Sequence, residues 1–400
     1  MRGRNGCPRE FATNNSGLDS LHNNSNSRRD RACVPTRRHD SPQRHCAVIM
    51  EKLHIRIVGS GLIGTSIALG AAQQGHTLEL EDREASARQL AEDLLQSQIS
   101  QGEPDLVVIA TPPTHAWEAL KNESEIYPQA TFIDVASVKN NLLQNVESFS
   151  GISHRFVGTH PMAGREVAGP SSAQSDLFQG RAWIVTPTGH TEKKRLDLVL
   201  SFIESLGATP YLMDAVDHDQ LLARISHLPQ VLSTALAAAI SQIDAGLELS
   251  GQGLRDMTRI ANSEGRLWSE ILLSNQDEVL RAISEFSSQL NDLKVAISNQ
   301  DSRTIENIFE KGKIGRGKVS GKHGAQPRNY VHLLVVIKDE PGALRQLFDE
   351  CAHVHANIED LSIEHSPQQE TGLITLAFSP DDAEKVEKHL RDRHWKVHVR

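Results

Sequence analysis

Short apolar runs alternate with helical patterns in the first half of the chain. Strands are predicted at residues 53–58, 77–81, 105–110, 131–135, 156–159 and 182–186, of which 105–110 is the clearest apolar run. Consecutive apolar positions are typical of strands that are buried on both faces of a sheet. Strands that alternate with helices predict a doubly wound, mostly parallel sheet of the α/β class.

A glycine motif follows the first of these strands directly. Gly59-x-Gly61-x-x-Gly64 stands between the strand and a helical pattern. In this arrangement Gly59 permits a tight turn, Gly61 lets the backbone approach a pyrophosphate, and Gly64 lets helix and strand pack closely. The N-terminus of the helix then faces the anion. The motif predicts a Rossmann-type dinucleotide-binding domain over residues 50–189.

An acidic residue ends the second predicted strand, about 20 residues past the glycines, where the ribose hydroxyls of NAD are commonly bound. Asp82 is the expected residue, and Glu81 is the competing one. Arg83 could instead meet the 2′-phosphate of NADP, so NAD is the expected cofactor and NADP stays open. The predicted cofactor contacts are Gly59, Gly61, Leu62, Ile63, Gly64, Asp82 and Thr111.

Helical patterns replace the alternation over residues 190–311, which predicts a helical substrate and dimerisation domain. Within it, residues 228–243 are apolar nearly all round. A helix of this kind is buried on every side, so we expect it to form a subunit interface in a homodimer. A core helix within one subunit is the alternative.

Two segments of the remaining chain differ in composition. Residues 312–328 interleave glycines with lysines and arginines, which predicts a linker, or alternatively a segment that grips an anion. Residues 329–400 show the order strand, helix, strand, strand, helix, strand, which predicts a small α+β ferredoxin-like domain.

The N-terminal residues 1–49 are rich in Arg, Asn, Ser and Pro, which predicts a disordered extension. Met50 stands immediately before the first strand, and our hypothesis is that it is the native start. The arginines suggest a transit peptide as an alternative, against which four acidic residues count.

Composition excludes several classes of protein. A net charge of −9 argues against non-specific nucleic-acid binding. No apolar run approaches the roughly 20 residues of a membrane span. The four cysteines show no metal-ligand spacing, so we expect no metal, and a reducing, cytoplasmic setting is the simplest interpretation.

Three further motifs suggest a family. His160-Pro-Met-Ala-Gly164 follows a strand, Ser226-His227-Leu-Pro229 opens the apolar helix, and Arg255-Asp256-Met-Thr-Arg259-Ile-Ala261 follows later. With the glycine motif, they make residues 51 to about 311 resemble the monofunctional bacterial prephenate dehydrogenases of tyrosine biosynthesis. The C-terminal unit, with Lys338-Asp-Glu-Pro-Gly-Ala-Leu344, resembles an ACT domain, a module that commonly binds amino acids as a feedback signal.

The resemblance implies NAD-dependent oxidative decarboxylation of prephenate to 4-hydroxyphenylpyruvate. Hydride leaves the carbinol carbon, a proton leaves its oxygen, and CO2 departs as the ring becomes aromatic. This chemistry needs a proton acceptor, groups that bind carboxylates, and a nicotinamide beside the ring. Arogenate dehydrogenation to tyrosine is the close alternative. A non-catalytic NAD or amino-acid sensor and a β-hydroxyacid-type dehydrogenase are more distant ones.

The resemblance also implies roles for matching side chains. His160 accepts the hydroxyl proton, and Ser137, which also follows a predicted strand, orients His160 and the nicotinamide. Arg259 holds the ring carboxylate, since its guanidinium fork matches a carboxylate. His227 contacts the pyruvyl side chain, and Asp256, at i,i+3, orients Arg259.

Other matches are less specific. Glu166 resembles a pocket gate and Trp268 a pocket wall. Ser137 could instead be a helix N-cap, His227 could be structural, and Arg255 competes for the carboxylate.

Three expectations complete the interpretation. His154 and His218 are expected at the surface. Residues 164–180 are expected to form a mobile lid beside the site, or an ordinary surface loop. A tyrosine effector is expected at Asp339, Pro341, Gly342, Ala343 and Leu344.

Overall fold

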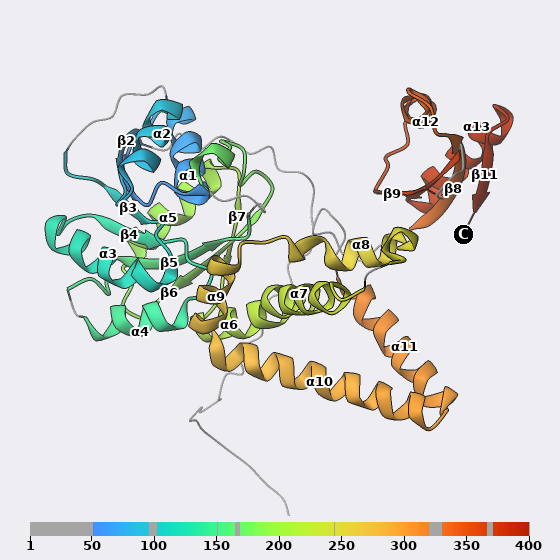
Figure 1. The fold of residues 1–400 in the computed structure, drawn as a ribbon. Helices are drawn as coiled ribbons and strands as arrows, with labels where there is room; N and C mark the ends of the chain where they lie inside the picture. Colours follow the sequence, from blue (N-terminus) through green and yellow to red (C-terminus); the bar gives the residue numbers. More distant parts are fainter. Residues whose placement is uncertain are drawn as a thin grey trace, which may run out of the picture. The chain divides into compact units, whose positions relative to one another are not determined.

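The computed structural model describes residues 51–95, 102–149, 151–164, 169–243, 245–319, 330–365 and 371–399 (Figure 1). The chain divides into two units, Met1–Ile49 and Met50–Arg400. The predicted N-terminal extension and the proposed start at Met50 lie outside the described residues.

A seven-stranded sheet forms the first part of this unit, with strand order β2-β1-β3-β4-β5-β6-β7. The strands are β1 (His54–Val58), β2 (Thr77–Glu81), β3 (Leu106–Ile109), β4 (Thr131–Asp134), β5 (Phe156–Pro161), β6 (Ala182–Pro187) and β7 (Thr209–Leu212). Strands β1 to β5 are parallel, whereas β6 pairs antiparallel with β5 and parallel with β7. The predicted mostly parallel sheet is confirmed, and the carboxyl ends of β1 to β5 share one edge.

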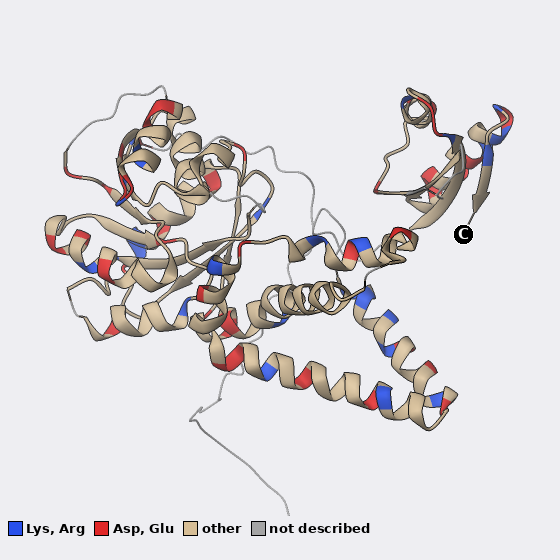
Figure 2. Ribbon diagram, viewed as in Figure 1, with Lys and Arg blue, Asp and Glu red and all other residues tan. Residues whose placement is uncertain are grey.

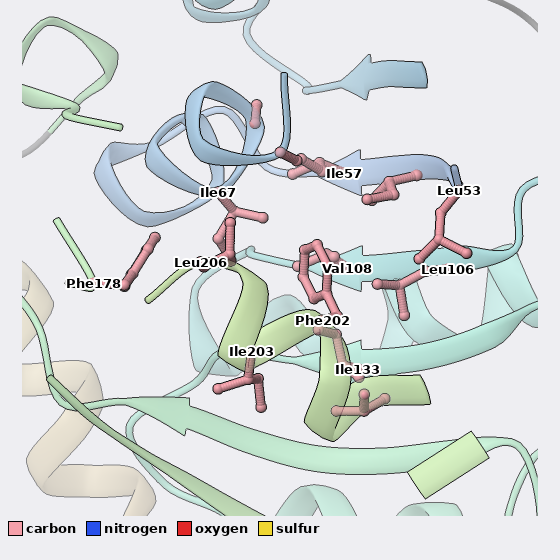
Figure 3. Close-up of a cluster of buried hydrophobic side chains, with 14 of the residues drawn as sticks. Leu53, Ile57, Ile67, Leu106, Val108, Ile133, Phe178, Phe202, Ile203 and Leu206 are labelled. Atoms are coloured by element: carbon pink, nitrogen blue, oxygen red, sulfur yellow. The ribbon is translucent and has the colours of Figure 1, made fainter. Parts of the chain in front are cut away.

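Helices cover both faces of the sheet. They are α1 (Leu62–Gln73), α2 (Ala85–Leu95), α3 (Pro113–Ile126), α4 (Asn140–Ser148) and α5 (Lys193–Ser205). In β3, Leu106 and Val108 point into the core under α1, α2 and α5 (Figure 3), while Val107 and Ile109 point into a second core under α3 and α4. Side chains alternate across a strand, so a strand that is apolar at every position joins two cores.

The predicted end of this domain at residue 189 is too early. Helix α5 places the fully buried Phe202 and Ile203 in the first core, and β7 extends the sheet through its pairing with β6. Most of the side chains of β7 are exposed, so this strand carries no apolar run that sequence analysis could detect. The domain therefore continues to Leu212.

The following region is helical, as predicted. It contains α6 (Ala215–Leu222), a π-helical turn η2 (Ala223–His227), α7 (Leu228–Ile240), α8 (Gln252–Thr258), α9 (Gly265–Ser274), α10 (Gln276–Ser298) and α11 (Ser302–Gly317). Short 3-10 turns are η1 (Pro170–Ser172), η3 (Leu247–Leu249) and η4 (Arg259–Ala261). The linker was expected to begin at residue 312, but residues 312–317 are still part of α11. Glycine lowers helix propensity and does not prevent a helix.

The apolar helix α7 is not buried within the single chain. Of its residues, only Gln230 and Ser233 are buried. The alternative of a core helix within one subunit is therefore wrong. Large apolar side chains of the long helices α10 and α11 are also exposed, between the charged residues that Figure 2 colours: Leu280, Leu290, Val295, Ile297, Phe309 and Ile314.

The C-terminal residues form the predicted ferredoxin-like unit. Its elements are β8 (Val331–Lys338), α12 (Ala343–His353), β9 (Asp360–His365), β10 (Thr371–Phe378), α13 (Pro380–Asp392) and β11 (Lys396–Val399). The antiparallel sheet has the order β11-β8-β10-β9. It shares a core of its own with α12 and α13, which includes Leu347, Phe378 and Val386.

None of the helices in the described ranges is both long enough and apolar enough to cross a bilayer.

Candidate active site

The glycine turn at the end of β1 is built for close approach by a ligand. Gly59 has φ +110, and a Cβ there would lie 2.5 Å from the carbonyl oxygen of Ala110. A Cβ on Gly64 would lie 1.9 Å from the carbonyl oxygen of Gly59. A Cβ on Gly61 would meet no atom within 4 Å. Two glycines are therefore required by packing, and the third borders open space.

That open space lies at the start of α1. Gly61 is the N-cap residue of α1, and no side chain caps the helix. The first backbone N–H groups of a helix have no partner within it and carry partial positive charge. The predicted contacts Leu62 and Ile63 lie in this first turn and are partly exposed. The residues therefore fit a dinucleotide pyrophosphate.

Asp82 lies beside the turn. Its Oδ2 accepts a hydrogen bond from the backbone N–H of Ser60 at 2.5 Å, and its Oδ1 accepts one from that of Glu84 at 2.8 Å. The competing carboxylate of Glu81 lies 3.7 Å from the guanidinium nitrogens of Arg56 and of Arg88. Asp82, rather than Glu81, is thus the acid that hydrogen-bonds to the glycine turn.

Two hydroxyl groups near this edge are buried without a partner among the described residues. They are Oγ of Ser60 and Oγ1 of Thr111, which follows β3. A buried hydroxyl that lacks a hydrogen bond costs free energy. Both hydroxyls could satisfy a hydrogen bond with a polar ligand, and the cofactor contact of Thr111 stays a prediction.

His160 lies at the carboxyl end of β5, and a second histidine holds its ring. Its Nδ1 is 2.9 Å from Nε2 of His218, and Nδ1 of His218 is 2.7 Å from Oδ1 of Asp219. His218 is fully buried, so its predicted surface position is wrong. His154 is partly exposed.

The Asp219 carboxylate lies at the N-terminus of α4. Its two oxygens accept hydrogen bonds from the backbone N–H groups of Lys139 and Asn140, both at 2.9 Å. The side chain of Lys139 is fully buried, and its ammonium donates to the Asp134 carboxylate and, at 2.6 Å, to the carbonyl of Thr159. Sequence reasoning missed both Lys139 and Asp219, because their partners come from distant parts of the chain.

The buried histidines of the site are held neutral. Burial lowers the pKa of His160 well below its ordinary value, and the nearby His218, Lys139 and His227 lower it further. Burial also lowers the pKa of His218, although Asp219 opposes this effect. The pKa of His227 falls to about 4, mainly through burial. His160 is thus unprotonated near pH 7, as a proton acceptor has to be.

His227 and Trp268 lie together. Their rings meet edge to face at a centroid distance of 6.2 Å. The side-chain nitrogen of Asn275 donates to the backbone carbonyl of Asp219 at 2.9 Å and lies 3.3 Å from Nδ1 of His227. Asn275 therefore links the His227 pocket to the histidine pair, a role that no motif had indicated.

The arginine segment lies against α7, where Gln230 donates to the carbonyl of Ile260 at 2.8 Å. Arg259 is exposed on η4, and Arg255 donates to the carbonyl of Ser250 at 3.1 Å. Asp256 accepts a hydrogen bond from Gln252 at 2.7 Å. Among the described residues Asp256 forms no ion pair with Arg259, so its expected orienting role is not observed.

Two predictions about Ser137 differ from the structure. The N-cap of α4 is Lys139, so Ser137 is not a helix cap. The ring of His160 is held by His218 rather than by Ser137. Ser137 is partly exposed near the strand ends, and orienting the nicotinamide remains its predicted role.

The predicted lid is only partly described. Glu166 lies outside the described residues. The segment 169–180 is anchored, because Ser66 accepts a hydrogen bond from the N–H of Gln174 at 3.1 Å and Phe178 is fully buried. For this segment these contacts favour the alternative of an ordinary surface loop, whose buried aromatic ring packs into the core.

The sheet, the glycine turn and a neutral histidine at the strand ends define an NAD-dependent dehydrogenase. Residues 53–212 match the family model for the prephenate dehydrogenase nucleotide-binding domain, and residues 214–311 match that for the prephenate dehydrogenase dimerization domain. The chain belongs to the prephenate dehydrogenase family.

Individual relatives agree with this assignment. The probable prephenate dehydrogenase NovF of Streptomyces niveus is 28% identical over 85% of this chain and 98% of its own length. The structure of A. aeolicus prephenate dehydrogenase with hydroxyphenyl propionate and NAD+ is 29% identical, with a TM-score of 0.61 over 68% of this chain and 99% of that one. Synechocystis arogenate dehydrogenase is 30% identical, with a TM-score of 0.58 over 66% of this chain and 99% of that one.

A pair of glycine variants tests the turn. Gly61→Ala adds a methyl group to open space, so the free energy of unfolding should change by less than about 0.5 kcal/mol, while NAD affinity falls by about tenfold or more, or about 1.4 kcal/mol. Gly59→Ala should instead lower the unfolding free energy by about 2 kcal/mol, because of its positive φ and the close carbonyl. Urea unfolding and NAD titration measure both; a Gly61→Ala protein that binds NAD normally would contradict the assignment.

Burial of neutral His227 predicts a pH-dependent stability. Below its ordinary pKa the unfolded state takes up a proton that the folded state does not, so stability falls as the pH drops from about 6.5 toward about 4. A shift of this size corresponds to about 3 kcal/mol at the low-pH limit. In urea unfolding across this range, His227→Gln should show a weaker pH dependence than the wild type. Parallel curves for the two proteins would refute the burial effect.

Proposed function

We propose that this protein oxidises prephenate with NAD, releasing 4-hydroxyphenylpyruvate and CO2. The observation that carries the proposal is the neutral His160 at the strand ends. Its Nδ1 is occupied by His218, while no described residue hydrogen-bonds its Nε2. Within the described ranges this nitrogen is therefore an open acceptor, on the edge of the sheet that also carries the glycine turn.

Each side chain then has a distinct task. NAD bound at the turn takes the hydride from the carbinol carbon of the substrate. Nε2 of His160 accepts the hydroxyl proton, and Ser137 contacts the same hydroxyl. Arg259 pairs with the ring carboxylate, and the wall formed by His227 and Trp268 receives the pyruvyl side chain.

Arogenate is the alternative substrate, and its amino group would favour a carboxylate partner. Among the described residues, Asp219 is the acid whose charge acts on His227, and its oxygens are already taken by His218 and the start of α4. A neutral imidazole suits a keto group better than an ammonium group. This supports prephenate over arogenate.

The two key side chains are tested together, with prephenate and arogenate assayed side by side using NAD and NADP. His160→Asn should lower kcat by about a hundredfold or more, the scale of a general base, with NAD affinity retained. Arg259→Ala should mainly raise the KM for prephenate. Full turnover by His160→Asn, or unchanged kinetics in Arg259→Ala, would remove the assigned role, and preference for arogenate would overturn the choice of substrate.

We also propose that the protein is a homodimer joined through its helical region. The exposed apolar side chains of α10 and α11 and the partly exposed ones of α7 support this, since a large exposed apolar surface commonly marks an interface. The matched family model for this region is described as a dimerization domain, which agrees with the proposal.

The C-terminal unit is proposed to be an ACT domain that binds tyrosine as a feedback inhibitor. The loop between β8 and α12 supports this assignment, because Gly342 has φ +95 and caps α12 without a side-chain contact. The helix start thus leaves N–H groups for an amino-acid carboxylate, next to Asp339, Pro341, Ala343 and Leu344.

Removal of residues 329–400 tests the regulatory proposal. The truncated enzyme should keep its kcat, because the helical and nucleotide-binding regions are intact, and should lose inhibition by tyrosine. Initial rates at increasing tyrosine concentration measure this effect. Inhibition that survives the truncation would place the tyrosine site elsewhere, and a full-length enzyme indifferent to tyrosine and phenylalanine would end the proposal.

A further inference from the structure

We propose that His218 and Asp219 fix the tautomer of His160, so that Nε2 of His160 always presents its lone pair to the substrate hydroxyl. This inference rests on the proposed function, because it gives His160 the part of proton acceptor. His218 and Asp219 are then positioning residues, which act through His160 without touching the substrate.

The direction of each hydrogen bond follows from Asp219. Its oxygens are surrounded by donors, namely the backbone N–H groups of Lys139 and Asn140 and the ring of His218. A carboxylate in such surroundings accepts hydrogen bonds. Nδ1 of His218 must therefore carry the proton that it donates to Asp219, which is 2.7 Å away.

The remaining assignments follow in sequence. A neutral imidazole carries one ring proton, so Nε2 of His218 is an acceptor. Nδ1 of His160, 2.9 Å from it, must then be the donor. Nε2 of His160 is consequently left without a proton. An unassisted imidazole would divide its population between two tautomers, of which only one can accept the hydroxyl proton.

The same series of hydrogen bonds, from Asp219 through His218, stabilises the protonated form of His160. When His160 takes the hydroxyl proton, its positive charge is separated from the Asp219 carboxylate by a single imidazole. The other charged or titratable groups acting on His160 are His227 and Lys139, and the Lys139 ammonium is itself paired with Asp134. Asp219 is thus the anion aligned with the ring of His160.

A purely structural role is the competing interpretation, since Asp219 also joins α6 to the start of α4. Two substitutions of His218 separate the roles. The amide of Asn reaches the position of the ring Nδ1 and keeps the bond to Asp219, whereas the amide of Gln reaches the position of Nε2 and keeps an acceptor for His160. His218→Gln thus preserves the hydrogen bond that is proposed to fix the tautomer of His160. His218→Asn preserves the structural link to Asp219.

Kinetics of the full-length enzyme with prephenate and NAD compare the variants. Outer-shell partners of this kind typically contribute about 10- to 100-fold, so His218→Asn should lose roughly that factor in kcat. His218→Gln should retain several-fold more activity than His218→Asn, and both should bind NAD normally. The exposed His190→Gln serves as the control and should match the wild type. If His218→Asn equals or exceeds His218→Gln, the link is structural and the proposal is overturned.

The tautomer can also be read without any substrate. Ring nitrogen-15 NMR of histidine-labelled full-length protein, with the His160 signals assigned by their loss in His160→Asn, should show a protonated Nδ1 and a bare Nε2 in the wild type. A protonated Nε2 would overturn the proposal even if a variant fails to fold. If the expected tautomer is found but neither prephenate nor arogenate is oxidised, the proposed function is wrong. The proposal that His218 and Asp219 fix the tautomer of His160 is then still supported.

Discussion

The contact between the Asp219 carboxylate and the start of α4 is the interaction on which the site depends. Asp219 belongs to the helical region, whereas the N–H groups of Lys139 and Asn140 belong to the nucleotide-binding domain. One carboxylate thus supplies a helix cap, holds His218 and ties the two regions together. Asn275 adds a bond to the backbone of the same residue. A charge at a helix N-terminus interacts favourably with the helix dipole, so the link serves stability and chemistry at once.

Much of the fold could be predicted because its signals are local. The five parallel strands carry buried apolar residues, and the glycine turn could be recognised because Gly59 and Gly64 are needed by contacts with neighbouring backbone. The end of the domain could not be placed, because β7 is short and exposed and is held by its pairing with β6. The apolar composition of α7 could be seen in the sequence. Whether this helix is buried within one chain could be decided only from the structure, in which most of its residues are not buried.

The site was predictable to the extent that motifs mark it. His160, His227 and Trp268 were named from the sequence, and the structure places the last two in contact. His218 was assigned to the surface. Its ring lies against His160 on β5, far away in the chain, and sequence periodicity carries no information about such a partner. Ser137 shows the converse error, because nearness to His160 at the sheet edge did not make it the ring's partner.

The π-helical turn between α6 and α7 has a consequence for the angular placement of the histidines. An α-helix turns about 100° per residue, so residues nine positions apart, such as His218 and His227, would face opposite sides of a regular helix. The wider turn at Ala223–His227 advances each residue by a smaller angle and rotates His227 back toward the side of His218. A single local change of helical pitch thereby lets one continuous helical segment present both imidazoles to the same site.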